Sequence, residues 1–153
     1  TDESHVSSYV RYFILDSKLT EPMSQSQKTI IGEPLVINGR QLSLSRAVRA
    51  GNFIFLTGQV PMQDGQVMTS GSIEEQTRAC LISIRETLAE AGCGLEHIVK
   101  SMVWLKSRED FPGFDSVYAE YFPKGPPARS ALVSDFLVDI RVEIECVAYD
   151  PQS

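Results

Sequence analysis

Hydrophobic residues recur along this chain at two spacings, one typical of strands and one typical of helices. Five segments have the length and apolar content of strands: Ala47–Ala50, Phe53–Thr57, Ile98–Leu105, Arg129–Val133 and Arg141–Tyr149. The first two flank Gly51-Asn52, so they are predicted to form a hairpin, and a further turn is expected at Gln63–Gln66. In the last segment every second residue from Val142 onward is apolar, which predicts a strand with one face on a core.

The helical spacing occurs twice. Ser72 and Glu75 form a capping box at the start of Ile73–Ala91, and Gly92 follows as a stop signal, which predicts a helix of about 28 Å. A shorter helix is expected to begin near Pro112 and to end before Pro123. Its apolar stripe is expected to belong to the core rather than to a binding site, and it consists of Phe114, Val117, Tyr118, Tyr121 and Phe122.

The order β-β-α-β-α-β-β predicts an α+β sandwich, one mixed sheet with two helices on one face. The other face of the sheet would carry apolar side chains, namely Phe53 or Ile54, Val99 or Val103, and Val147. That face is too apolar for water, so we expect the chain to oligomerise. Residues 1–28 are rich in polar residues toward their end and are predicted to be a partly ordered N-terminal extension, while 29–153 form the domain. The alternative is that Tyr9–Leu15 forms a short strand or docking segment within this extension.

Composition and motifs argue against several classes of function. A net charge of −6 with scattered basic residues disfavours nucleic-acid binding. No apolar run is long enough to span a membrane, and three widely spaced cysteines fit reduced thiols, so a cytoplasmic location is expected. The two histidines, His5 and His97, form no metal-binding motif, so neither a metal site nor a serine or cysteine triad is expected.

Candidate chemistry is concentrated near the C-terminus, where Arg129 and Glu143 are expected on neighbouring extended segments. A guanidinium is a planar fork that matches a carboxylate, whereas a half-buried glutamate can hold water or relay protons. If an assembly buries this face, repulsion from Glu145 should raise the pKa of Glu143. The alternatives are that Arg129 only pairs with a nearby acid and that the two glutamates belong to a solvated row of charges.

Four stretches in consistent order resemble one known family. Ala47–Pro61 and Ile98–Ser101 resemble its early and middle signatures, while Pro127–Ser130 and Val142–Glu145 resemble its C-terminal signature. The family is the Rid (YjgF) family of enamine/imine deaminases, also labelled L-PSP endoribonucleases. The resemblance implies a chorismate-mutase-like fold and a homotrimer whose active sites lie between subunits.

The resemblance also implies an activity, namely cofactor-free hydrolysis of short 2-imino acids and their enamine tautomers, such as 2-iminobutanoate and 2-iminopropanoate, to 2-keto acids and ammonia. By position, Arg129 would bind the substrate carboxylate and Glu143 would hold or activate water. The other implied contacts are backbone groups of Gly58 and Ala131, the Thr57 hydroxyl and a pocket wall from Phe111. Two departures concern the substrate: Leu44 stands where relatives have a tyrosine, and Asp115 replaces the usual asparagine.

Two other functions stay open at this point. The loss of the tyrosine at Leu44 favours a non-catalytic trimer that binds small carboxylates through Arg129. Ribonuclease activity is a label given to some relatives, but the net charge of −6 and the absence of a general-base histidine from the matched motifs argue against it.

Overall fold

A computed structural model describes residues 28–37 and 39–151 of the chain. Its centre is one six-stranded sheet in the order β1-β4-β5-β10-β8-β9. All neighbouring pairs are antiparallel except β8 and β9, so the sheet is mixed, as expected. The strands are β1 (Thr29–Ile31), β4 (Ala47–Ala50), β5 (Phe53–Leu56), β8 (Ile98–Leu105), β9 (Ala128–Val133) and β10 (Val142–Tyr149).

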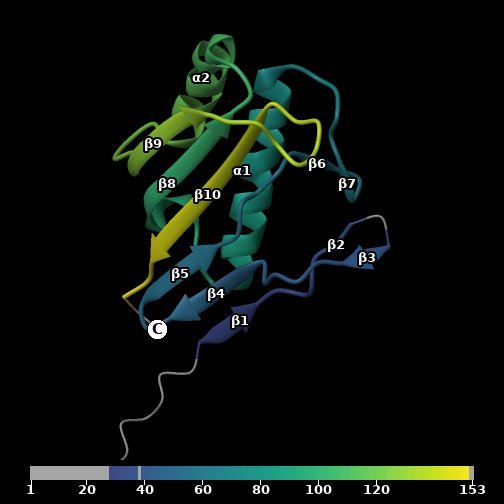
Figure 1. The fold of residues 1–153 in the computed structure, drawn as a ribbon. Helices are drawn as coiled ribbons and strands as arrows, with labels where there is room; N and C mark the ends of the chain where they lie inside the picture. Colours follow the sequence, from purple (N-terminus) through teal and green to yellow (C-terminus); the bar gives the residue numbers. More distant parts are fainter. Residues whose placement is uncertain (1–27, 38, 152–153) are drawn as a thin grey trace, which may run out of the picture.

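Two helices, α1 (Ile73–Glu90) and α2 (Phe111–Tyr121), pack against each other and cover one face of this sheet (Figure 1). The predicted capping box is present, because the Ser72 hydroxyl accepts from the Glu75 amide and the Ser72 amide donates to the Glu75 carboxylate. The helix ends one residue earlier than predicted. Ala91 is its C-cap, and Gly92 follows in the left-handed region at φ +77°, which glycine adopts without strain.

The hydrophobic core lies between the sheet and the helices. In β5 the side chains of Ile54 and Leu56 are buried, whereas Phe53 and Phe55 point to the other face. In β8 Val103 is buried, and Val99 is exposed as the extra residue of a bulge between the pairs Lys100–Val147 and Ile98–Ala148. The predicted stripe of α2 is confirmed as core at Phe114, Val117, Tyr118 and Phe122, and Tyr121 packs against it.

The face of the sheet that carries no helix is apolar, as predicted. Phe53 and Phe55 are 43% and 47% exposed, and the Phe53 ring lies 5.3 Å from that of Tyr149. Figure 1 views the molecule from this side, with β10 and β5 in front of α1. A face of this kind is typical of an interface, but the expected oligomer itself stays a prediction.

Short strands extend the predicted pattern. The turn expected at Gln63–Gln66 is confirmed as the tip of a hairpin formed by β6 (Met62–Gln63) and β7 (Gln66–Val67). Its central Asp64 and Gly65 have φ values of 52° and 75°, the positive values that such a hairpin turn requires. A second short pair is β2 (Val36–Ile37) with β3 (Arg40–Gln41). Two single turns of 3₁₀-helix are also present: Leu95–His97 lies directly before β8, and Arg108–Asp110 lies directly before α2.

The predicted N-terminal extension, including Tyr9–Leu15, lies outside the described residues, and the domain boundary stays a prediction. Between residues 28 and 151, position 38 aside, no helix has the length and apolar character needed to cross a bilayer.

Candidate active site

Arg129 lies on β9, the edge strand of the sheet, and its side chain points to the face that the helices cover. The parallel register pairs it with Ser101 of β8. Its guanidinium carbon lies 4.8 Å from the centroid of the Tyr118 ring, 5.1 Å from Phe114 and 5.7 Å from Phe111, all three rings from α2. Helical spacing places these rings on one side of α2, so the aromatic stripe serves as core and also as a cradle for the cation.

A buried hydrogen bond anchors the Tyr118 ring of the cradle. The Tyr118 hydroxyl lies 2.7 Å from the Ser101 hydroxyl, and both residues are buried. Burial raises the pKa of Tyr118 to about 12, so the phenol is neutral at ordinary pH and no anion forms beneath the guanidinium. The aromatic rings therefore fix the position of Arg129 without neutralising its charge.

A carboxylate already contacts this guanidinium. Asp115, one turn along α2 from Phe111, lies 2.8 Å from Arg129, between Nη2 and Oδ1. The alternative interpretation of Arg129, that it pairs with a nearby acid, is thus observed in the single chain. The same contact demonstrates that a carboxylate fits the guanidinium when the aromatic cradle supports it.

Glu143 lies on the opposite face of the sheet. Its neighbours Val142 and Ile144 are buried against the helices, so alternation along β10 directs Glu143 to the uncovered face. The expectation that Arg129 and Glu143 occupy neighbouring strands is wrong, because β8 lies between β9 and β10. One chain therefore does not bring the two side chains together.

Gly58 fits closely against Glu143. A Cβ atom on Gly58 would lie 2.0 Å from Glu143 Oε1, which no side chain tolerates unless the carboxylate moves. The backbone bulges here: Phe55 pairs with Val147 and Gln59 with Ile144, so four steps on one strand oppose three on the other. Such an extra residue re-aims the chain, and it brings the Gly58 backbone against the carboxylate.

The pKa of Glu143 is raised, as expected, but the leading cause differs from the expected one. Burial in the single chain is the larger cause, and the charge of Glu145 two residues along β10 is the smaller one. Repulsion between the two carboxylates therefore adds to an increase in the pKa of Glu143 that burial in the single chain already causes.

The predicted site residues form two groups. Ala131 and Phe111 belong with Arg129, because Ala131 lies two residues along β9 on the same face and Phe111 is part of the cradle. Thr57 and Gly58 follow β5, and Gly58 lies against Glu143. Leu44 is 39% exposed and lies in the segment before β4. β4 is four strand spacings, or about 19 Å, away from β9 across the sheet.

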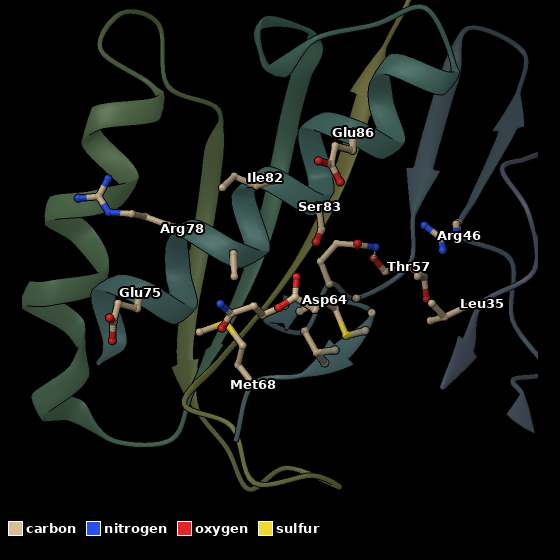
Figure 2. A pocket seen from close by; sticks show the side chains of 17 residues that line it. Leu35, Arg46, Thr57, Asp64, Met68, Glu75, Arg78, Ile82, Ser83 and Glu86 are labelled. Atoms are coloured by element: carbon tan, nitrogen blue, oxygen red, sulfur yellow. Dashed lines mark hydrogen bonds between the residues drawn. The ribbon is translucent and has the colours of Figure 1, made fainter. Parts of the chain in front are cut away.

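A cavity of about 630 Å³ lies elsewhere, between α1 and the β6–β7 hairpin. Figure 2 shows Ile82, Ser83 and Glu86 of α1 along one side of it and Arg46 and Leu35 along the other. Thr57 and Gly58 also line it, but Arg129, Glu143, Phe111 and Ala131 do not. This cavity therefore does not bring the two groups of candidate residues together.

Among the residues that the structure describes, no group of three or more histidine, cysteine, aspartate or glutamate side chains is arranged to hold a metal ion. The Gly94 amide donates to Nδ1 of His97 at 3.0 Å, so that histidine caps a local turn. His5 lies outside the described residues.

Comparison with known proteins identifies the family. Residues 40–150 match the family described as endoribonuclease L-PSP. The chain belongs to this family, the Rid/L-PSP family. A RutC family protein of Pyrococcus horikoshii is 43% identical over 108 residues, covering 69% of this chain and 85% of the relative. The mitochondrial protein mmf1 of Schizosaccharomyces pombe is 34% identical over 129 residues, covering 82% and 78% of the two chains.

Solved structures of the Rid/L-PSP family have the same fold. Yeast Mmf1 superimposes with a TM-score of 0.74 at 30% identity, covering 81% of this chain and 99% of that one. A Rid family protein of unknown function from Yersinia pestis gives 0.72 at 28% identity, covering 80% and 99%. The expected chorismate-mutase-like fold is thereby confirmed. Because some relatives are named as mitochondrial, the cytoplasmic location stays a prediction.

Three residues of the candidate site in this Rid/L-PSP chain are not predicted by the sequence patterns. Phe114 and Tyr118 were assigned to the core alone, and Ser101 was not singled out. A signal was present, since Phe111, Phe114 and Tyr118 share one helical face. Nothing in the sequence indicated that β9 would lay Arg129 across that face.

Proposed function

We propose that this chain hydrolyses 2-imino acids and their enamine tautomers to 2-keto acids, without a cofactor. The observation that carries the proposal is the Arg129 guanidinium held over three aromatic rings with a carboxylate at 2.8 Å. A substrate carboxylate would take a position of the same kind. Family membership and the match of the surrounding motifs support the assignment.

The reaction needs few chemical groups. A protonated imine is already an electrophile, so water adds to its carbon and one proton of that water passes to the nitrogen. The C–N bond then breaks, ammonia leaves, and the remaining hydroxyl proton is released as the carbonyl of the 2-keto acid forms. Positioning and one proton relay suffice for these steps. Glu143 would take the proton from the attacking water, and its raised pKa moves it closer to the pH at which a carboxylate can both accept and return a proton.

A complete site requires a second subunit. Arg129 and Glu143 lie on opposite faces with β8 between their strands, so one chain contributes two separate halves. The uncovered face that carries Glu143 is also the apolar face with Phe53 and Phe55. We therefore propose a homotrimer in which the Arg129 half of one subunit meets the Glu143 half of the next.

The decisive experiment is a trapping assay. An amino-acid oxidase generates 2-iminobutanoate, semicarbazide traps the imine that is left, and acceleration of hydrolysis by the protein is measured. Arg129→Ala should reduce kcat/KM about 100-fold, since charged hydrogen bonds contribute about 1.5–3 kcal/mol each. Arg78→Ala is the matched control, because Arg78 is an exposed arginine paired with Glu120 and should leave the rate unchanged.

Two further measurements separate the parts of the proposal. Glu143→Gln should change the shape of the pH–rate profile, and an unchanged profile would remove the proton relay. Native mass should equal three times 17.0 kDa, and Phe55→Glu on the apolar face should abolish both assembly and activity. A wild-type monomer with full activity would exclude a site between subunits.

A non-catalytic carboxylate-binding trimer is the second candidate, favoured by Leu44 in place of a tyrosine. No acceleration with any short imino acid, together with binding that Arg129→Ala abolishes, would establish it. The family name and several structural relatives refer to endoribonuclease. For this chain that activity would require RNA cleavage that survives rigorous purification, against a net charge of −6.

A further inference from the structure

The ion pair between Arg129 and Asp115 makes this half-site electrically balanced. The Arg129 side chain is 22% exposed and rests on aromatic rings, whereas Asp115 is 50% exposed at the rim of the same cradle. Asp115 is the one carboxylate of the described chain within ion-pair distance of Arg129. An incoming carboxylate therefore meets a guanidinium whose charge is already partly compensated.

Arg129 can still accept a ligand beside Asp115. A guanidinium has five N–H donors on a planar fork, and the contact with Asp115 runs through Nη2. A second carboxylate on the fork would bring two negative charges to within a few ångströms of each other. Because the rings of Phe114 and Tyr118 exclude water from one side of the guanidinium, solvent weakens this repulsion less than on an open surface.

We propose that Asp115 makes the site selective for zwitterions, that is, for carboxylates whose α-nitrogen is positively charged. Arg129 holds the carboxylate and Asp115 accepts a hydrogen bond from the cationic nitrogen. In a 2-iminium acid the nitrogen is two bonds from the carboxylate carbon, so its two charges are about as close together as those of Asp115 and Arg129. The Arg129 guanidinium, the ligand carboxylate, the ligand nitrogen and the Asp115 carboxylate then form a closed ring of four charges that alternate in sign.

This inference rests on the proposed function and specifies its substrate class. A protonated 2-imino acid is a zwitterion and is the electrophilic form, whereas the 2-keto acid product is a plain anion. Asp115 therefore favours the reactive form over the product. An asparagine at this position would lack the charge that makes this distinction.

Two ligands of equal carbon skeleton test the selectivity without any turnover. 2-Aminobutanoate is a stable zwitterion and 2-oxobutanoate is the anionic product, and their dissociation constants are measured by NMR titration or calorimetry. Wild type should bind the amino acid about tenfold more tightly than the keto acid. Asp115→Asn should reverse this order, chiefly by tightening the keto acid, and Asp115→Glu should restore part of it.

Glu120→Gln is the matched control, since it removes another carboxylate of α2 that pairs with Arg78 rather than with Arg129. It should leave both constants unchanged. Circular dichroism establishes that each variant is folded, and the wild-type ratio of the two constants tests the inference even if Asp115→Asn does not fold.

The outcomes distinguish the two levels of the proposal. Equal binding of both ligands by wild type, or a ratio that Asp115→Asn leaves unchanged, overturns the inference while imine hydrolysis can still stand. A preserved ratio without imine hydrolysis supports the inference as a ligand site and overturns the enzyme. Binding of neither ligand by wild type overturns the inference together with the carboxylate site.

Discussion

Replacing Gly58 by alanine tests whether Glu143 acts through its present position. The new Cβ would lie 2.0 Å from Glu143 Oε1, and ordinary contact begins at 3.4 Å, so the carboxylate must move by about 1.4 Å. Gly58 does not have a positive φ, so alanine fits its backbone without strain. The substitution therefore displaces one functional group and leaves the chain's path intact.

Stability and activity should respond differently to Gly58→Ala. The contact involves the far end of a flexible side chain, and alanine reduces the freedom of the unfolded chain, an effect worth about 0.4–1 kcal/mol in favour of folding. The free energy of unfolding should thus change by less than about 1 kcal/mol. A displacement of more than 1 Å commonly costs about 100-fold in rate, so kcat/KM should fall by about that factor.

The assay is imine hydrolysis combined with urea unfolding, applied to Gly58→Ala, Glu143→Gln and the double variant. If both changes act on the same carboxylate, the double variant is no slower than the slower single variant. Gly92→Ala is the control: its φ of +77° makes alanine strained while its Cβ meets nothing within 4 Å, so stability falls and the rate does not. Full activity in Gly58→Ala, or fully multiplicative losses in the double variant, would refute the reasoning.

Three further predictions concern single interactions. Burial raises the pKa of Glu143, so the folded state binds that proton more tightly than the unfolded chain does. Stability should therefore decline as pH rises above the ordinary glutamate value of about 4 and through the raised pKa, and Glu143→Gln should lessen this decline in urea unfolding measured at each pH. Tyr118→Phe should lower the free energy of unfolding by about 1–2 kcal/mol, because it leaves the buried Ser101 hydroxyl without its partner. Calorimetry should find 2-oxobutanoate binding unchanged within about threefold, and a large loss of binding would contradict the view that only the ring of Tyr118 supports Arg129. Asp110→Ala should lower the free energy of unfolding by about 1–2 kcal/mol, measured by heat or urea. This is less than the loss expected for a fully buried ion pair, because its partner Arg141 is 45% exposed and can be hydrated again. A loss above about 4 kcal/mol would contradict this reasoning.

Local pattern was sufficient for most elements of the fold. The capping box at Ser72, the apolar stripe of α2 and the alternation of β10 each depend on residues a few positions apart, and all three predictions are confirmed. The shortest strands were not predicted, since two or three residues carry no periodicity. These short strands exist because they pair with strands elsewhere in the chain, as β1 does with β4.

The sequence by itself determined which residues are chemically competent, because motif and residue type are local properties: Arg129, Glu143 and Gly58 can all be read from it. Only the tertiary structure decided how they are arranged. β8 lies between β9 and β10, parallel to the first and antiparallel to the second, and so separates Arg129 from Glu143. The packing of α2 gives Arg129 its rings and its partner Asp115. Strand order and helix packing are set by long-range burial, which brings distant segments together and leaves no local mark in the sequence.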